Sequence, residues 1–415
     1  MRWIRMRRAF VVGSVAAAVS IAASGCGFSG PSVGPSGDAS TGGDAGGDAA
    51  IADAPPDGRP PDSPPPPPIH TRRIDITGAQ VTGGPHTDFP LLVSITAPWL
   101  RPTTAGGDVA SASGFDLGFF ADAAGTTRLA HEVEAYRGDA GNGNGALLAW
   151  VKVPSLAESS ELFLRYGDPA ITASQENIAA VWSNGFAAVW HLGGVFTDST
   201  ANANSGTNSG STAIGGQISE ARSFNGTTDF VDLGSGASID NVFTGGGTIE
   251  AWFRASGWGE GSRGKIIEKN DASTVDVEGW TLGVDNANVT GSILFGHGSS
   301  VGIGGVWNAQ AGSVSLNAWT HVAVVYDKGS AANNPSIFIN GSMVTVSETA
   351  TPGGSMSSDA TYSGRLGNRI AGDRAFNGRL DEVRLSRSAR SPGWIATSHR
   401  NQLNPGAFYT VSDPL

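Results

Sequence analysis

The stretch Ile337-Phe338-Ile339-Asn340-Gly341-Ser342-Met343-Val344 places an Asn-Gly pair between two strand-like runs. Asn-Gly between such runs is the strongest short-range signal for a β-hairpin, because both residues accept a positive φ. The same pair recurs at Asn225-Gly226 and Asn377-Gly378, where we also expect turns. Upstream of the hairpin, residues 319–327 are rich in β-branched and aromatic side chains, as a central strand should be. This part of the chain is therefore predicted to be antiparallel β-structure.

Strand-like runs also fill the region before residue 170. They are residues 73–76, 91–95, 116–120, 132–136, 147–153 and 161–166. Six such runs in roughly 95 residues predict an antiparallel sandwich. A helical spacing of apolar residues occurs only near Ile178, Val181 and Trp182, and we place the domain junction just before it. The chain has 60 glycines, which indicates many turns between short strands.

The first 25 residues have the parts of a secretory signal. Arginines at positions 2, 5, 7 and 8 precede an apolar run of about 14 residues, short of the roughly 20 that span a membrane. The following Ala23-Ser24-Gly25-Cys26 resembles the lipobox of bacterial lipoproteins, although leucine is usual where Ala23 stands. This resemblance implies that residues 1–25 are a lipoprotein signal peptide and that Cys26 is lipidated. The alternative is a plain secreted protein with a chance cysteine.

The resemblance also implies a location. Gly27 is not the aspartate that retains such lipoproteins at the inner membrane, so we expect a lipid-anchored protein at the bacterial outer membrane or cell surface. Residues 26–69 are almost entirely Gly, Ser, Ala, Asp and Pro, and cannot bury a core, so they are predicted to be a disordered tether. Residues 64–68 are five prolines, which form a stiff polyproline II segment.

Charge and cysteine content exclude some classes of function. The net charge is −11 and no basic run follows the signal, which argues against nucleic acid as a partner. Cys26 is the single cysteine, so an intramolecular disulfide and a cysteine–zinc site are both excluded.

Two family resemblances refine the expected domains. Residues 87–93, 131–134, 150–154 and 166–168 resemble an uncharacterised bacterial β-domain family, domain of unknown function 2341, which carries no known activity. A laminin-G-like neighbour is common in that family. The second resemblance is to the laminin-G-like branch of the concanavalin A-like jelly rolls. Its carrying segments are residues 224–226, 229–231, 248–254, 266–269, 280–284, 319–327, 340–341, 366–367 and 376–385.

We therefore expect an all-β protein with two β-sandwich domains after the tether. The first, at 70–170, is an immunoglobulin-like or jelly-roll-like sandwich, and the second, at 180–413, is a laminin-G-like jelly roll. Lectins, glucanases and adhesion modules all use the second fold, so the fold alone does not assign a function.

A calcium site is one candidate for the second domain. Asp198, Thr200 and Asn202 offer oxygen ligands at every second position of a loop, and Ca²⁺ takes six to eight oxygens. The segment is similar to the calcium-binding loop of many laminin-G-like jelly rolls. Asp381 is a further candidate ligand, because strand alternation puts it on the inward face with Val383.

A buried carboxylate needs a partner or a metal, and the sequence leaves the choice open. In the alternative to the calcium site, Asp381 pairs with Arg222 or Arg379 and the loop after Asp198 is a simple turn.

Other residues are candidates for ligand binding or catalysis. Trp258 and Trp307 lie among glycine or polar residues, so each ring either stacks on a sugar or plugs an end of the sandwich. Glu132 and Glu134 share a strand face, but such pairs are usually solvated. Residues 276–278 resemble the end of a jelly-roll glucanase motif that carries three carboxylates on alternate residues. This chain lacks the first of the three. His191, His297 and His321 show no metal spacing, and His321 is expected in a core.

The function expected from the sequence is a lipid-anchored cell-envelope binding or adhesion protein without catalysis. Its laminin-G-like domain would recognise an extracellular or periplasmic glycan or protein, with calcium as a candidate cofactor. The alternatives are a glycan-active hydrolase of the same fold and a purely structural envelope protein.

Overall fold

The computed structural model describes residues 68–270, 278–301 and 304–415. The predicted signal peptide, Cys26, all but the end of the tether, and Asp276 lie outside these described residues. Within them, no helix is both long and apolar enough to cross a membrane.

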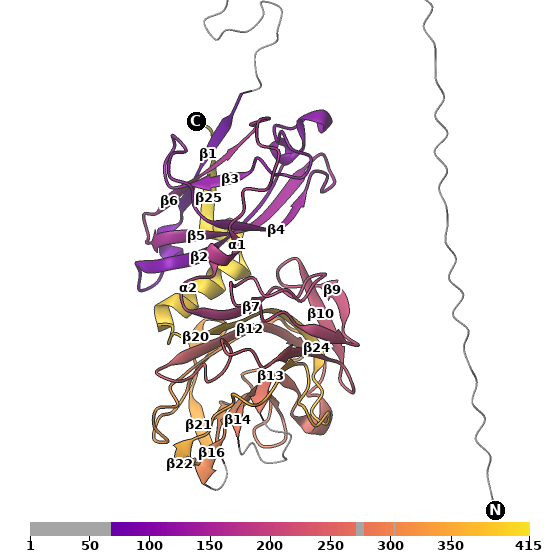
Figure 1. The fold of residues 1–415 in the computed structure, drawn as a ribbon, viewed down its shortest axis with the longest axis vertical. Coiled ribbons are helices and arrows are strands. Elements are labelled where there is room, and N and C mark those ends of the chain that lie inside the picture. Colours follow the sequence, from indigo (N-terminus) through magenta and orange to yellow (C-terminus); the bar gives the residue numbers. More distant parts are fainter. Residues whose placement is uncertain (1–67, 271–277, 302–303) are drawn as a thin grey trace, which may run out of the picture. The chain divides into compact units, whose positions relative to one another are not determined.

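The first sandwich packs two antiparallel sheets (Figure 1). One sheet has the strand order β25-β1-β6-β3 and the other β2-β5-β4. Their bounds are β1 (His70–Ile76), β2 (His86–Ala97), β3 (Gly118–Phe120), β4 (His131–Arg137), β5 (Gly145–Leu156), β6 (Glu161–Tyr166) and β25 (Tyr409–Pro414). The six strands expected between residues 70 and 170 are confirmed, because each alternating run has one face to bury.

The second sandwich also consists of two large antiparallel sheets. One has the order β20-β19-β18-β12-β24-β10-β9, with β7 also paired to β24, and the other has the order β21-β17-β15-β14-β13-β23-β11-β8. The strands of the first of these sheets are β7 (Phe186–Trp190), β9 (Thr212–Gly215), β10 (Glu220–Asn225), β12 (Gly247–Ala255), β18 (Thr320–Tyr326), β19 (Ser336–Ile339), β20 (Ser342–Met343) and β24 (Asn377–Ser386).

The strands of its second sheet are β8 (Thr207–Ser209), β11 (Phe230–Gly234), β13 (Lys265–Asn270), β14 (Gly279–Asp285), β15 (Ser292–His297), β17 (Gly305–Ala309), β21 (Val346–Ala350) and β23 (Gly364–Leu366). A small separate ribbon pairs β16 (Ser299–Val301) with β22 (Gly353–Met356). The expected all-β architecture with a jelly-roll-like second sandwich is therefore confirmed.

Among the described residues, the α-helices that accompany the sheets are α1 (Ile178–Val181), α2 (Pro392–Leu403) and α3 (Pro405–Phe408). Helix α2 begins with the side chain of Ser391 accepting a hydrogen bond from the backbone N–H of Trp394, and Pro392 occupies its first position. Short 3-10 turns cover 78–80, 98–100, 103–105 and 260–262.

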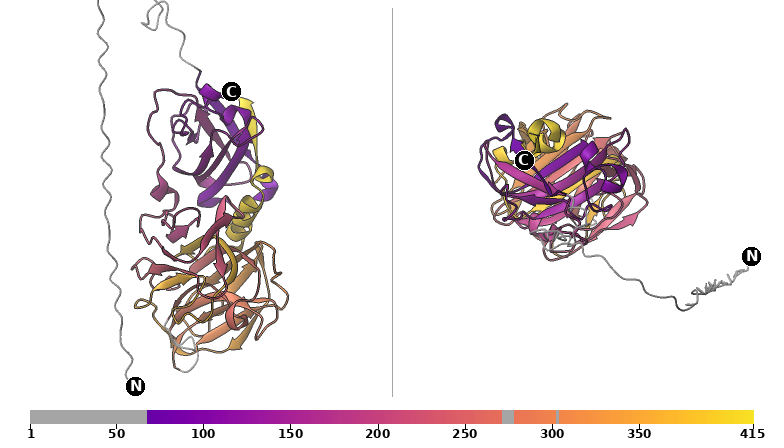
Figure 2. Two further views of the ribbon diagram at one scale, coloured as in Figure 1. Left: turned by 90° about the vertical axis from the view of Figure 1, so that its right-hand side faces the viewer. Right: turned by 90° about the horizontal axis from the view of Figure 1, so that it is seen from above.

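Helix α2 joins the two sandwiches (Figure 2). The Asn401 side chain donates to the backbone carbonyl of Leu92 in β2 and accepts from its N–H, while Gln402 accepts from the indole of Trp252 in β12. One hydrophobic cluster continues from the first core through α2 to Ala323 and Phe338 on the outer face of the second sandwich. The two sandwiches thus bury apolar surface against each other, which favours a fixed junction.

The predicted hairpin at Asn340-Gly341 is confirmed, with φ of 49° and 76° between β19 and β20. The expected turn at Asn377-Gly378 is wrong, because both residues lie inside β24 and pair with β10. A Cβ at Gly378 would lie 2.3 Å from the carbonyl oxygen of Arg254, so this glycine serves a close approach between strands.

Strand β24 contains a bulge that changes the orientation of Asp381. Glu382 has a φ of 49°, and the register with β12 shifts between Glu250 and Trp252. The extra residue places Leu380 and Val383 in the core of the second sandwich. The Asp381 carboxylate instead accepts a hydrogen bond from Ile218, which belongs to the other hydrophobic cluster. The expectation that Asp381 shares a face with Val383 is therefore wrong.

The last strand of the chain pairs with the first. Tyr409–Pro414 forms β25, which lies antiparallel to β1 and extends a sheet of the first sandwich. The sequence prediction grouped these residues with the second domain, up to residue 413, whereas their hydrogen bonds complete the first.

Candidate functional site

A pocket of about 650 Å³ lies where the two sandwiches meet. Strand β4 contributes one wall, and helix α1, the segment after β7 and the start of β10 contribute the others. The lining residues are Glu132 to Ala135, Arg137, Ile178, Ala179, His191, Gly193 to Val195, Thr197 to Thr200, Ser219 and Glu220. The pocket therefore combines carboxylates, hydroxyls, an imidazole and aliphatic side chains.

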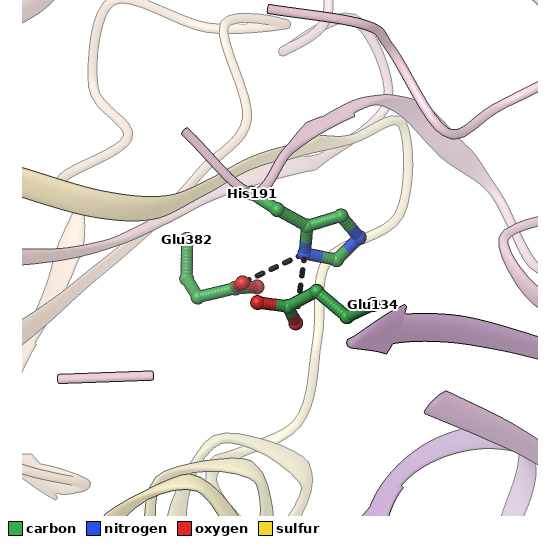
Figure 3. Close-up of side chains that lie close together, drawn as sticks. All are labelled: Glu134, His191 and Glu382. Carbon is green, nitrogen blue, oxygen red and sulfur yellow. Dashed lines mark hydrogen bonds and ion pairs between the residues drawn. The ribbon is translucent and has the colours of Figure 1, made fainter. Parts of the chain in front are cut away.

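His191 is surrounded by three glutamates at the base of this pocket. Its Nδ1 lies 2.7 Å from Glu382 Oε1 and 3.8 Å from Glu134 Oε2 (Figure 3). Its Nε2 lies 3.2 Å from Glu132 Oε2. We refer to Glu132, Glu134, His191 and Glu382 as the junction cluster, because the first two come from β4 and the others from the second sandwich.

Two indole groups fix the glutamates of β4. The Trp182 Nε1–H donates to Glu132 Oε2 at 2.6 Å, and the Trp150 Nε1–H donates to Glu134 Oε2 at 2.9 Å. The hydroxyl of Ser199 donates to the second oxygen of Glu132 at 2.8 Å. Hydrogen bonds to charged groups are stronger than neutral ones, so these carboxylates are held in defined orientations.

Arg384 fixes the third glutamate. Its Nη2 donates to Glu382 Oε2 at 2.6 Å, and its guanidinium lies over the rings of Trp150 and Trp182 at 4.3 and 4.8 Å. The two indoles therefore bind the carboxylates through their N–H groups and the arginine through the faces of their rings.

The cluster shifts the pKa of each of its members. Burial would lower the pKa of His191, but Glu382 and Glu132 outweigh burial and hold that pKa well above its usual value. Burial and then Glu382 raise the pKa of Glu134 to about 7. Burial alone would raise the pKa of Glu382, yet His191 and Arg384 leave it lowered. Near neutral pH the cluster is thus a protonated imidazole between ionised and partly protonated carboxyl groups.

The sequence pattern found only half of this cluster. It placed Glu132 and Glu134 on one strand face, which agrees with their shared neighbour His191, but the expected solvation is wrong because Glu132 is only 8% exposed. His191 and Glu382 were missed, since neither has a metal-type spacing and 191 positions separate them. The signal available in the sequence was the pair of acids on one predicted strand together with Trp150 on a neighbouring one.

The predicted calcium loop has a different geometry. Asp198 Oδ1 accepts from the backbone N–H groups of Val189 and Thr200. Asp198 Oδ2 accepts from the Thr200 hydroxyl and from both the backbone and side-chain amides of Asn204. The side-chain amide of Asn202 donates a hydrogen bond to the backbone carbonyl of Ala187. Calcium binding would instead need the side-chain oxygen of Asn202 to face an ion shared with Asp198. Protein donors thus satisfy Asp198, and calcium at Asp198, Thr200 and Asn202 stays a prediction.

Asp381, the fourth predicted calcium ligand, is fully buried and shares no hydrogen-bond partner with Asp198 among the described residues. The alternative pairing with arginine is wrong. Arg222 donates to the carbonyl of Gly194, and Arg379 donates to the carbonyl of Gly215.

The two tryptophans proposed as sugar platforms differ in exposure. Trp307 is 0% exposed, stacks on Phe295 and donates its N–H to Asn334, so its predicted role in ligand binding is wrong. The ring packs inside the sandwich because its strand face is apolar. Trp258 is partly buried against the same core, and its ligand-binding role stays a prediction.

A comparison with known families matches part of the second sandwich. Residues 225–396 match a family described as the concanavalin A-like lectin/glucanases superfamily. This region is similar to concanavalin A-like domains. The predicted laminin-G-like resemblance is therefore supported for these residues. A comparison with curated proteins gave no match.

Several solved structures are similar to this chain at low sequence identity. The binding domain of Paraclostridial Mosquitocidal Protein 1 is 15% identical, with a TM-score of 0.41 over 52% of each chain. Domain 4 of an extracellular arabinanase from Geobacillus stearothermophilus, solved with arabinotriose, is 18% identical, with a TM-score of 0.38 over 52% of this chain and 98% of that one. The botulinum neurotoxin serotype G binding domain is 13% identical, with a TM-score of 0.39 over 52% and 50%. The chain thus matches about half the length of the first and third.

Proposed function

We propose that this chain is a binding protein of the cell envelope that recognises a glycan in the pocket beside the concanavalin A-like domain. The observation that carries the proposal is the convergence of fixed hydrogen-bonding groups in one pocket of about 650 Å³. Small-molecule pockets range from roughly 300 to 1,000 Å³, so a terminal sugar with its neighbour fits the available volume.

The chemistry of the lining supports a hydroxyl-rich ligand. Glu132 and Glu134 present carboxylate oxygens whose orientations are set by indole N–H groups, and sugar hydroxyls are donors. Val195 and Ile178 add exposed aliphatic surface, at 69% and 40% exposure, for the apolar C–H face of a sugar ring. Rigid polar groups beside a small apolar patch give orientation and specificity.

Lipid anchoring completes the proposal. Cleavage before Cys26 and acylation would leave a long polar tether between the membrane and the sandwiches. Mass spectrometry of the mature N-terminus tests this part. An unmodified Cys26 in the envelope fraction would remove the anchor and leave a secreted binding protein.

A glycan array followed by calorimetry tests the ligand. We expect Val195→Trp to abolish binding, because the larger side chain fills the pocket. The matched control is Val301→Trp, which changes a similarly exposed valine, 62% accessible, in the ribbon of β16 and β22. Binding that survives Val195→Trp would contradict the pocket, and a silent array would contradict the glycan. Release of sugar products in the same assay would favour the hydrolase alternative.

A further inference from the structure

One atom from each of Glu134, His191 and Glu382 converges in the junction cluster, and all three lie within 4.8 Å of one another. We propose that these three side chains bind a divalent transition-metal ion of the Zn²⁺ class, held between the two sandwiches. An imidazole nitrogen and two carboxylate oxygens form a donor set that Zn²⁺ accepts, and the ligands of one such ion lie within a few ångströms of each other.

The groups around the three ligands are those that metal sites require. Metal-bound histidines almost always donate their other ring N–H to a carboxylate or carbonyl. The ion would replace the proton on His191 Nδ1. Nε2 then faces Glu132 Oε2 at 3.2 Å, and Glu132 is itself fixed by Trp182 and Ser199. Trp150 orients Glu134 in the same way. Every proposed ligand thus has a second contact that sets its direction.

The local charge also favours a cation. Four carboxyl groups, of Glu132, Glu134, Asp381 and Glu382, gather near two cationic side chains, His191 and Arg384. Asp381 lies within electrostatic reach of Glu382 and Glu134, and its fully buried Oδ1 has no hydrogen-bond partner within the described part of the chain. Burying an excess of carboxylates is costly, and a divalent ion at the centre of the cluster removes that cost.

Access and selectivity follow from the same residues. Glu134 and His191 line the pocket, which gives the ion a route from solvent. Ca²⁺ and Mg²⁺ prefer all-oxygen sites, whereas an imidazole ligand favours transition metals. Binding should therefore follow the order Zn²⁺ above Mn²⁺ above Ca²⁺. Three protein ligands leave a coordination position for water or for a group of a bound molecule.

Calorimetry on the purified, chelator-treated full chain tests the site with metal alone, so the result does not depend on the glycan. We expect one Zn²⁺ per chain. Glu134→Gln and His191→Gln remove a ligand and should weaken binding at least ~10-fold, and Glu132→Gln, which acts through His191, should weaken it ~10- to 100-fold. The control Glu158→Gln changes an exposed glutamate in the β5–β6 turn and should leave binding unchanged.

A pair of histidines outside the junction cluster provides the strictest control. The rings of His321 in β18 and His399 in α2 lie 5.7 Å apart. Loss of Zn²⁺ binding in His399→Gln but not in His191→Gln would overturn the proposal, as would the absence of Zn²⁺ binding. Should the cluster variants fail to fold, X-ray absorption on the zinc-loaded wild type decides. One imidazole with oxygen ligands at about 2.0–2.2 Å supports the site, and no imidazole or two overturns it.

Discussion

Asp198 in its loop and the glutamates of the junction cluster are all largely buried carboxylates, but their hydrogen bonds are satisfied in opposite ways. Asp198 accepts five hydrogen bonds, all from residues between 189 and 204, so its loop is complete in itself. The members of the junction cluster come from β4, from the end of β7 and from β24. Its carboxyl groups outnumber the cationic side chains that contact them.

The difference shows which kind of buried carboxylate can still bind a further donor or cation. A local motif that is visible in the sequence can fill its own lone pairs with neighbouring backbone N–H groups. A cluster assembled from distant strands depends on packing to bring donors and acceptors together, and here packing leaves an excess of acceptors.

The first prediction concerns the cation of the junction. Arg384→Ala leaves Glu382 buried without its salt bridge, and removing one partner of a buried ion pair costs about 3–5 kcal/mol of unfolding free energy. Urea unfolding measures the change. Arg379→Ala, on the same strand but only half-buried, should cost less than about 1 kcal/mol. Equal costs for the two variants would contradict the special role of the junction.

The second prediction concerns the loop. Asp198→Ala strands several buried donors, and we expect a loss of about 3 kcal/mol, whereas Asp198→Asn keeps one acceptor oxygen and should lose less. The loss should be the same with Ca²⁺ and with chelator, because hydrogen bonds carry it. A loss that appears only with Ca²⁺ would contradict this explanation and support the calcium site predicted from the sequence.

The third prediction extends the comparison to histidines. Burial lowers the pKa of His297 to about 4, whereas the carboxylates of the junction raise that of His191. Between pH 6.5 and about 4 the unfolded chain binds a proton at position 297 that the folded chain does not. Stability should therefore fall as the pH drops through this window, by up to about 3 kcal/mol.

Urea unfolding of wild type and His297→Gln across the same pH range isolates this contribution from those of the carboxylates. The variant should show the shallower loss, and parallel curves would contradict the assignment.

The smallest effect is expected at the hairpin. Gly341 has a φ of 76°, and a Cβ there would lie 3.0 Å from His399 Cβ, so Gly341→Ala should cost about 1–2 kcal/mol. Gly215→Ala has no positive φ and no heavy atom within 4 Å of the added Cβ, and should be nearly neutral. Thermal unfolding distinguishes the two.

The strands could be predicted from the sequence because alternation and turn chemistry are local. The run 319–327 became β18, and Asn340-Gly341 became its neighbouring hairpin. The bulge at Glu382 could not be predicted, because one extra residue against β12 reverses the face of Asp381 without any local signal. Trp307 was misjudged for a related reason: glycines around it marked close packing rather than exposure.

The site required knowledge of how the two sandwiches pack. Glu132 and Glu134 were visible as a pair, but the distance of 2.7 Å between His191 and Glu382 arises from the pairing of β7 with β24 and from contacts across the junction. Neither feature leaves a pattern in the sequence, because the residues that meet are far apart along the chain.

The pairing of β25 with β1 has a mechanical consequence. Figure 1 shows the end of the chain beside its first strand, and β1 is hydrogen-bonded to β25 on one side and to β6 on the other. A pull applied just before His70 acts along β1, across hydrogen bonds that lie perpendicular to it. The two ladders are then sheared rather than unzipped, so the point at which the tether would transmit force is the strand clamped from both sides.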